Sequence, residues 1–435
     1  MDWEALYRAR TTTAPEAVGR IRSGDRVVVA HACGEPSHVL DAMVDNAAAY
    51  RDVEIVHLVA MGKSAYCAPE HAEHFRHNSL FLGGSTRQAI AEGRGDFTPC
   101  FFFELPKLFS TSMRVDVALV TVTPPDENGM CSLGVSVDYT LEAVRRAALV
   151  IAQVNARMPY TLGQSTVPVS DIDCFVPCDA PILELPPPHI GPVEEAIGRN
   201  CASLIRDGDT LQLGIGAIPD AVLRFLTDKH DLGLHSELLS NGAAALMEAG
   251  VITNRKKTLH PGKSVATFLM GTRRLYDFAH RNPDLMMAPV DYVNDPRVIC
   301  KNDNMVSINS CVQVDLMGQV ASESIGPRQI SGVGGQVDFV RGAAMSRGGR
   351  SIIAMASTAK NGRSKIVPIL DEGTAVTTSR NDVDYVVTEY GIAHLKGCTL
   401  RERARALSAI AHPDSRSALT EACARREGGI GHVRA

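Results

Sequence analysis

Residues 204–242 read LIRDGDTLQLGIGAIPDAVLRFLTDKHDLGLHSELLSNG, and this stretch predicts a strand, a glycine turn and a helix in succession. Residues 210–213 predict a short buried strand, which runs into Gly214-Ile215-Gly216. Pro219 and Asp220 then open an apolar-periodic helix. Glycines let backbone N–H groups approach a ligand closely, and the helix dipole favours negative charge at its start. The sequence therefore predicts an anion and oxyanion site at this turn.

One carboxylate follows this unit closely. The segment LHSELLSNG, residues 234–242, places Glu237 at the expected end of the next strand. Strand ends beside a glycine loop are where open α/β sheets bind ligands. A dinucleotide fingerprint matches poorly, because G-x-G-x-x-G needs glycine where the chain has Pro219. A purely structural turn is the plain alternative.

An earlier segment repeats the same order of features. Ile21-Arg22-Ser23-Gly24-Asp25 precedes a predicted strand, a turn and Pro36, just as Ile205-Arg206-Asp207-Gly208-Asp209 precedes the strand over 210–213, the glycine turn and Pro219. Ile21 and Pro36 lie 15 positions apart and Ile205 and Pro219 lie 14 apart, so one gap aligns the two segments. The shared I-R-x-G-D followed by strand and helix predicts an internal duplication.

A length of 435 residues favours two domains. Apolar runs bounded by turn-forming residues predict buried parallel strands. These runs cover residues 26–30, 53–60, 115–122, 149–154, 263–270, 305–314, 352–356 and 383–388, and helices are predicted over 139–148 and 399–412. We therefore predict α/β domains with mainly parallel sheets over residues 1–188 and 189–435, joined by the proline-rich segment 185–192.

Composition and charge exclude several classes of protein. The chain is 45% hydrophobic and 21% charged, as in ordinary soluble proteins, and its net charge of −5 with scattered basic residues argues against a nucleic-acid partner. It has no apolar run long enough to span a membrane and no apolar signal core, so we expect a cytoplasmic protein. The eleven cysteines are irregularly spaced, and Cys174 and Cys178 have no second matching pair, which favours reduced thiols over zinc or disulfides.

The sequence does not support a metal site, a P-loop or a serine-hydrolase elbow. His71, His74 and His77 have helix-compatible spacing, but no nearby cysteine completes a metal site, so a solvated helix face is expected and no metal. The P-loop motif is absent because Gly62-Lys63-Ser64 and Gly262-Lys263-Ser264 lack its leading glycine, and no G-x-S-x-G elbow is present.

The second half adds a second glycine turn and a basic turn. Gly332, Gly334 and Gly335 imply backbone lying close to a ligand or a neighbouring chain, and the segment 359–365, AKNGRSK, suits a phosphate or a solvated surface loop. A glutamate is ionised at neutral pH, since its ordinary pKa is about 4.3. It can attack as a nucleophile when N–H donors stabilise the resulting oxyanion. This chemistry fits acyl transfer between carboxylates, but it does not choose between Glu237 and Glu323.

Five motifs together resemble the acetyl-CoA hydrolase/transferase family of family I CoA-transferases, and within it the 4-hydroxybutyrate CoA-transferase group. They are GIGAIPDAV at 214–222, HSELLSNG at 235–242, SGVGGQVDFVRGA at 331–343, AKNGRSKIVP at 359–368 and TEYGIA at 388–393. The resemblance runs over essentially the whole chain. It implies two similar CoA-transferase-like α/β domains with the active site between them. One departure is Asn241, where close relatives are expected to have aspartate.

The resemblance also assigns roles to residues. It implies that Glu237 is the nucleophile and that CoA contacts Gly214, Ile215, Gly216, Ala217 and Ile218, then Gly332, Gly334, Gly335 and Lys360. The implied reaction moves CoA from acetyl-, butyryl- or 4-hydroxybutyryl-CoA to a carboxylate such as acetate, through a glutamyl anhydride and a glutamyl-CoA thioester. CoA is then a substrate and no cofactor is bound permanently. A homodimer or homotetramer is expected from the family. An acyl-CoA hydrolase and a non-catalytic CoA-binding protein are the alternatives.

Overall fold

The computed structural model describes residues 2–430, with side chains up to residue 425, and the chain forms two compact units. Unit 1 comprises residues 1–186, 236–241 and 263–295, and unit 2 comprises 187–235, 242–262 and 296–435. The first crossing, between Pro186 and Pro187, lies within the predicted proline-rich linker. The second domain was expected to be continuous from residue 189. Residues 236–241 and 263–295, which the predicted second domain includes, group with unit 1. Phe268 and Met287 form β-bridges with Ser136 and Gly163 of that unit, and Glu237 lies in the first of the two segments.

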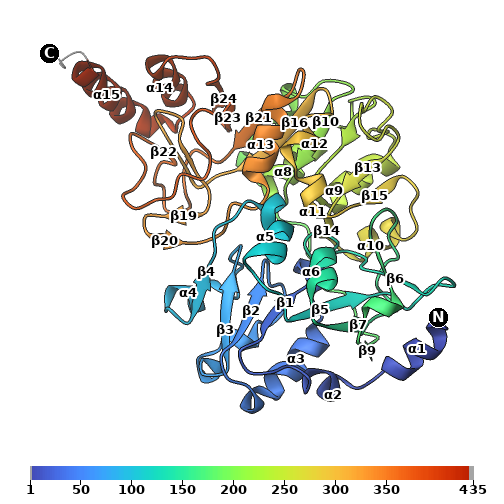
Figure 1. Ribbon diagram of the computed structural model, residues 1–435. Coiled ribbons are helices and arrows are strands. Elements are labelled where there is room, and N and C mark those ends of the chain that lie inside the picture. Colours follow the sequence, from blue (N-terminus) through green and yellow to red (C-terminus); the bar gives the residue numbers. More distant parts are fainter. Residues whose placement is uncertain (1, 431–435) are drawn as a thin grey trace. The chain divides into compact units, whose positions relative to one another are not determined.

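Unit 1 is built on a seven-stranded sheet whose neighbouring strands all pair in parallel (Figure 1). In order across the sheet the strands are β4 (Gly95–Phe97), β3 (Phe75–Ser79), β2 (Val53–His57), β1 (Arg26–Val29), β5 (Val117–Val122), β7 (Leu149–Val154) and β9 (Cys174–Pro177). Its helices are α1 (Trp3–Arg10), α2 (Ala14–Val18), α3 (Ser37–Asp45), α4 (Arg87–Ala91), α5 (Leu105–Thr111), α6 (Thr140–Arg146), α10 (Arg273–Ala279) and α11 (Val290–Val293). Helices α2 and α3 cover one face of the sheet, and α5 and α6 cover the other (Figure 1).

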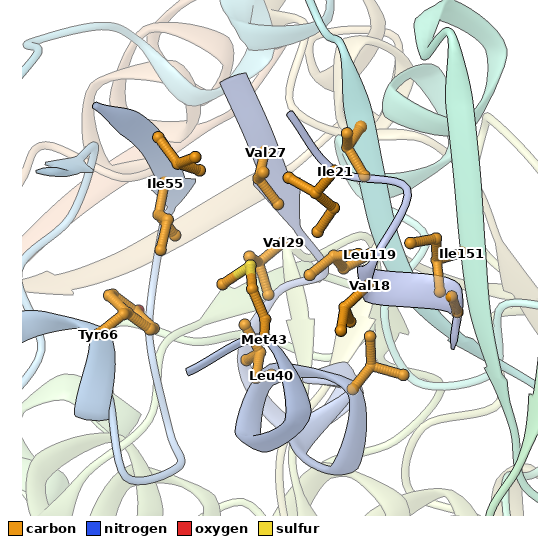
Figure 2. Close-up of a cluster of buried hydrophobic side chains, with 14 of the residues drawn as sticks. Val18, Ile21, Val27, Val29, Leu40, Met43, Ile55, Tyr66, Leu119 and Ile151 are labelled. Carbon is orange, nitrogen blue, oxygen red and sulfur yellow. The ribbon is translucent and has the colours of Figure 1, made fainter. Parts of the chain in front are cut away.

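The main hydrophobic core of unit 1 lies between the sheet and α2 and α3. Figure 2 shows Leu40 and Met43 of α3 directed toward Val27, Val29 and other apolar strand residues. Strand residues of β1, β5 and β7 are buried on both faces of the sheet, so their sequences are continuous apolar runs rather than alternating ones.

Unit 2 contains a six-stranded sheet that is parallel except at one edge. In order its strands are β11 (Gly233–Leu234), β10 (Thr210–Leu213), β16 (Met305–Ser310), β21 (Arg350–Ala354), β23 (Tyr385–Thr388) and the antiparallel β24 (Gly391–His394). Its helices are α7 (Pro192–Ser203), α8 (Ala217–Arg224), α12 (Pro296–Ile299), α13 (Gln336–Met345), α14 (Leu400–Ala409) and α15 (Pro413–Ile430), while α9 (Asn241–Glu248) begins at the unit boundary.

Smaller sheets complete both units. In unit 1, β6 (Met130–Ser132) pairs with β8 (Thr166–Pro168), β12 (Leu238–Leu239) with β14 (Phe268–Leu269), and β13 (Ser264–Ala266) with β15 (Leu285–Met287). In unit 2, β17 (Gln313–Asp315) lies between β18 (Val320–Ala321) and β22 (Ile366–Val367), and β19 (Ser324–Ile325) pairs with β20 (Arg328–Gln329). The fold class, α/β with mainly parallel sheets, is as predicted.

Five parallel strands follow the same order in both sheets, β2-β1-β5-β7-β9 and β11-β10-β16-β21-β23, as an internal duplication predicts. Strand β1 lies between β2 and β5, and β10 lies between β11 and β16. The I-R-x-G-D turns before these strands share their hydrogen bonds: the Asp25 carboxylate accepts the Arg22 N–H at 2.8 Å, and the Asp209 carboxylate accepts the Arg206 N–H at 2.6 Å. The glycine of each turn has φ near +80°, at +81° and +78°. Each turn therefore needs glycine for the same conformational reason.

Three local predictions are wrong. The predicted strand over 305–314 is two strands of different sheets, β16 and β17. Residues 71–77 do not form a helix: His71 ends a short 3₁₀ turn (Pro69–His71), and His77 is buried in strand β3. The predicted strand over 263–270 is two strands, because pairing changes at Thr267, whose N–H donates to the Glu237 carbonyl at 2.9 Å.

Candidate functional site

Glu237 immediately precedes β12 in unit 1 and is partly exposed. Strand β12 pairs in parallel with β14, and the Glu237 carbonyl accepts N–H groups from Thr267 at 2.9 Å and Phe268 at 3.2 Å. The carbonyl of this residue is thus held by two N–H groups at the start of the neighbouring strand β14. A carboxylate held this way keeps a defined position while part of it stays accessible to a reactant.

Asn294 holds the side chain of Glu237. Its Nδ2 donates to Glu237 Oε2 at 2.7 Å. Asn294 is fully buried directly after α11, where its own N–H donates to the Val290 carbonyl. The sequence does not indicate this contact, because the two partners are 57 positions apart and no motif surrounds residue 294. Hydrogen bonds to an ionised carboxylate are stronger than neutral ones, so Asn294 favours one orientation of the glutamate.

The glycine turn of unit 2 lies where the sequence predicted it, between β10 and α8. Gly216 has φ +116° and stands at the start of the helix, and Ile215 is exposed. A Cβ placed on Gly214 or Gly216 would meet no other described atom within 4 Å, so the turn is open on that side. Ala217 and Ile218, the first residues of the helix, are half-buried. Backbone N–H groups at a helix start with open space beside them can bind an anion.

The second glycine turn and the basic turn belong to the same unit. Gly335 precedes α13, with Gly334 at φ +53° and Gly332 buried. Lys360 is exposed on the loop after β21. This loop is closed by hydrogen bonds between Ala359 and Arg363 and between Gly362 and Ala359. Strands β10, β16 and β21 are adjacent and parallel. The glycine turn after β10 and the Lys360 loop after β21 therefore both follow the carboxyl ends of strands on the same side of this sheet.

Glu323, the other candidate nucleophile, is buried and engaged in unit 2. Its carboxylate accepts the Thr377 hydroxyl at 2.9 Å and the Gln329 amide at 3.3 Å. Its carbonyl accepts the N–H groups of Ile330 and Ser331, which lead into the second glycine turn. These contacts support a role for Glu323 in shaping that turn.

Asn241, where the family resemblance leads us to expect aspartate, has a structural role in unit 1. Its Oδ1 accepts both the N–H and the hydroxyl of Thr272, each at 3.2 Å. A Cβ on Gly271 would come within 2.7 Å of this oxygen. An aspartate at this position could accept the same two hydrogen bonds.

The turn of unit 1 that corresponds to the glycine turn is closed by its own carboxylate. Glu35 is buried and accepts the N–H groups of Met61 at 3.2 Å and Gly62 at 3.0 Å and the hydroxyl of Ser37 at 3.1 Å. Burial raises the pKa of this carboxyl group, although the three hydrogen bonds oppose the change. His57 lies 3.9 Å away, and burial holds its pKa well below the usual range. The duplicated turns have therefore diverged, one filled by a side chain and the other open.

Within residues 2–430 the structure contains no group of three or more His, Cys, Asp or Glu side chains placed to hold a metal ion. The same part of the chain includes no helix long and apolar enough to cross a membrane.

Comparisons with known proteins agree with the motifs. The acetyl-CoA hydrolase/transferase N-terminal domain matches residues 1–183, and the C-terminal domain of the same family matches residues 271–423. The 4-hydroxybutyrate coenzyme A transferase of Clostridium kluyveri is 62% identical over 96% of this chain and 98% of its own length. The succinyl-CoA:cyclohexane-1-carboxylate CoA transferase of Geobacter metallireducens is 46% identical over 97% of both chains.

A solved structure shares the architecture as well. The crystal structure of 4-hydroxybutyrate CoA-transferase from Porphyromonas gingivalis has a TM-score of 0.85 and 45% identity, covering 98% of this chain and all of that one. The chain belongs to the acetyl-CoA hydrolase/transferase family and is an enzyme of that family.

Proposed function

We propose that this enzyme is a CoA-transferase that moves CoA from a short-chain acyl-CoA to a free carboxylate, with Glu237 as the nucleophile. The acyl-CoA is acetyl-, butyryl- or 4-hydroxybutyryl-CoA, and acetate is a representative acceptor. Family membership supports the reaction class, and the near-full-length relatives described above are named as CoA-transferases. The observation that carries the assignment is the partly exposed Glu237 carboxylate oriented by Asn294.

The proposed reaction is a double displacement. A Glu237 carboxylate oxygen attacks the thioester carbonyl, the C–S bond breaks, and a mixed glutamyl anhydride and CoA thiolate form. The thiolate then attacks the glutamyl carbonyl, which releases the first carboxylate and leaves a glutamyl-CoA thioester. An acceptor carboxylate reverses these steps. No net proton or electron transfer is needed, so the reaction requires no redox cofactor.

Backbone N–H donors stabilise the oxyanions of such a reaction best when they are fixed before it begins. Asn294 donates to Glu237 Oε2, so it is suited to orient the attacking carboxylate. The glycine turn at the start of α8 and Lys360 are assigned to CoA binding in this proposal. Lys360 is an exposed cation on a loop at the same sheet edge as the glycine turn, which suits a phosphate of CoA.

Trapping the thioester tests the nucleophile. The enzyme is incubated with butyryl-CoA, reduced with borohydride and digested, and the peptides are analysed by mass spectrometry. We expect one modified residue, at 237, together with loss of activity, and no modification of E237Q. A modification at Glu323 or a fully active E237Q would contradict the assignment. Assays with and without acetate separate the transferase from a hydrolase, because only a hydrolase consumes acyl-CoA without an acceptor.

Lys360 provides a test of CoA binding. We expect Lys360→Ala to raise KM for the acyl-CoA about 10-fold with a smaller change in kcat, because a phosphate contact contributes equally to the ground and transition states. Lys301→Ala, which removes an exposed lysine elsewhere in unit 2, is the matched control. An unchanged KM in Lys360→Ala would remove Lys360 from the CoA site.

A further inference from the structure

Unit 1 contains a hollow of about 740 Å³ at the amino ends of its central strands. Arg20, Arg22, Arg114, Asp25, Asp116 and Leu149 are among the residues that line it. Asp25 directly precedes β1, Asp116 precedes β5, and Leu149 begins β7. The hollow therefore lies at the amino ends of the strands, whereas the Glu35 turn follows the carboxyl end of β1. No step of the proposed reaction uses the hollow.

The strand registers identify the same place in unit 2. In unit 1, Val27 pairs with Val117, which pairs with Leu149. In unit 2, Leu211 pairs with Val306, which pairs with Arg350. Since Asp25 corresponds to Asp209, Val27 corresponds to Leu211, and Leu149 therefore corresponds to Arg350.

In unit 2 this position is filled by the chain itself. The Arg350 guanidinium is buried, forms an ion pair with Asp209 and donates to the carbonyls of Leu204 at 2.8 Å and Gly348 at 3.1 Å. Leu149 cannot make these contacts, because it has no polar atom and is a shorter side chain. The corresponding position is thus filled by the Arg350 side chain in unit 2, whereas in unit 1 it is open.

The two units also differ in the charged residues around this position. Arg20 stands where unit 2 has Leu204, and Arg114 stands where unit 2 has Asp303, by the alignments of Ile21 with Ile205 and of Val117 with Val306. The hollow of unit 1 therefore has two arginines that its counterpart lacks.

The two carboxylates at the hollow already have partners. Asp25 accepts the Arg22 N–H, and Asp116 accepts the Arg26 N–H at 2.9 Å and pairs with the Arg114 guanidinium at 2.7 Å. Among the side chains that the structure describes, up to residue 425, neither Arg20 nor Arg22 forms an ion pair through its guanidinium, although the charge of Arg20 is the last of several causes that lower the pKa of the exposed Glu16 carboxyl group. Two exposed guanidinium groups beside an open hollow can attract a phosphate group and donate charge-assisted hydrogen bonds to it.

We propose that this hollow binds the phosphate group of a small organic phosphate, with Arg20 and Arg22 as its principal ligands. The volume admits a ligand larger than the phosphate alone. This site is independent of the proposed transferase reaction, because its ligands lie outside every segment assigned to Glu237 or CoA.

The test is a calorimetric titration of the full-length enzyme with glycerol 3-phosphate. CoA is present at saturation, so that a CoA site cannot take up the probe. We expect one binding event per chain in the wild type and binding about 10-fold weaker or more in the R20Q/R22Q double variant, as the loss of charge-assisted hydrogen bonds predicts. Transferase activity of this variant should equal that of the wild type, which also shows that it is folded.

The matched control is R8Q/R145Q, which removes two exposed arginines from the same unit. It should bind the probe as the wild type does. Absence of binding to the wild type would overturn the proposal. So would equal weakening in both double variants, which shows surface charge alone, or binding of free arginine in place of glycerol 3-phosphate, which shows a cation site like that of Arg350.

Discussion

At the scale of single residues, Asn294 determines how the Glu237 carboxylate is presented. The asparagine is fully buried and donates to Oε2 at 2.7 Å, whereas the backbone of Glu237 is fixed separately by Thr267 and Phe268. Removing the amide therefore leaves the main chain in place and frees only the carboxylate. The consequence should appear in the chemical step rather than in folding or in binding of the thioester.

Asn294→Ala should lower kcat about 10- to 100-fold, because a hydrogen bond to a charged group contributes about 1.5–3 kcal/mol. KM for the acyl-CoA should change less. Steady-state kinetics with butyryl-CoA and acetate measure both values. Asn128→Ala, at an exposed turn of the same unit, is the control and should retain full activity. A kcat unchanged in Asn294→Ala would mean that the hydrogen bond does not orient the nucleophile.

Gly62 illustrates a residue whose identity is set by a neighbour. A Cβ at this position would lie 1.9 Å from Glu35 Oε1, and the same carboxylate accepts the Gly62 N–H. Gly62→Ala should therefore lower the free energy of unfolding by about 1–3 kcal/mol through overpacking. Gly84→Ala is the matched control, since a Cβ there meets no other described atom within 4 Å. Urea unfolding of both variants measures the difference, and equal stabilities would show that Glu35 moves aside freely.

At the scale of elements, strand β11 is held at its end by Lys257. The side chain passes over Gly233, where a Cβ would come within 2.5 Å of Lys257 Cγ, and Nζ donates to the Leu234 carbonyl at 2.8 Å. Burial lowers the pKa of this ammonium group to about 7. The ordinary lysine pKa is about 10.4. Between these two values the unfolded chain holds a proton that the folded chain has released, so stability rises with pH in that window.

Lys257→Met removes this titration. We expect the free energy of unfolding of the wild type to rise, relative to Lys257→Met, by about 1 kcal/mol per pH unit between about pH 7 and 10, which is the direction and limit of a single proton. Urea unfolding at several pH values within the window measures the difference. Lys107→Met, which removes an exposed lysine, should show the same pH dependence as the wild type. An unchanged difference across the window would show that Lys257 is protonated in the folded enzyme.

Four other strand segments show how much of the fold could be predicted from the sequence. Strands over 149–154 and 210–213 were located to the residue, because burial on both faces produces an unbroken apolar run bounded by turn residues. The run over 263–270 looks the same but serves two strands with different partners. Strand β24 was not predicted because it is an antiparallel edge strand beginning at Gly391, where two-sided burial ends. The contact of Asn294 with Glu237 depends on tertiary packing and leaves no local pattern.

At the scale of the whole molecule, the duplication explains why two turns with one sequence signature have different energetic roles. Asp25 and Asp209 each accept the N–H of the arginine three residues earlier. Only Asp209 also pairs with a buried guanidinium, that of Arg350, because Leu149 stands at the corresponding position of unit 1. Equivalent substitutions in the two units should therefore have unequal effects on stability.

Asp25→Asn should lower the free energy of unfolding by about 1 kcal/mol or less, because the asparagine oxygen still accepts the Arg22 N–H. Asp209→Asn should cost about 3–5 kcal/mol, since it leaves the Arg350 charge buried without a counter-ion. Adding Arg350→Leu, which copies unit 1, should restore much of the loss by removing that charge. Urea unfolding of the two single variants and the double variant measures these values. Equal losses in Asp25→Asn and Asp209→Asn, or no recovery in Asp209→Asn/Arg350→Leu, would show that the ion pair does not account for the difference between the units.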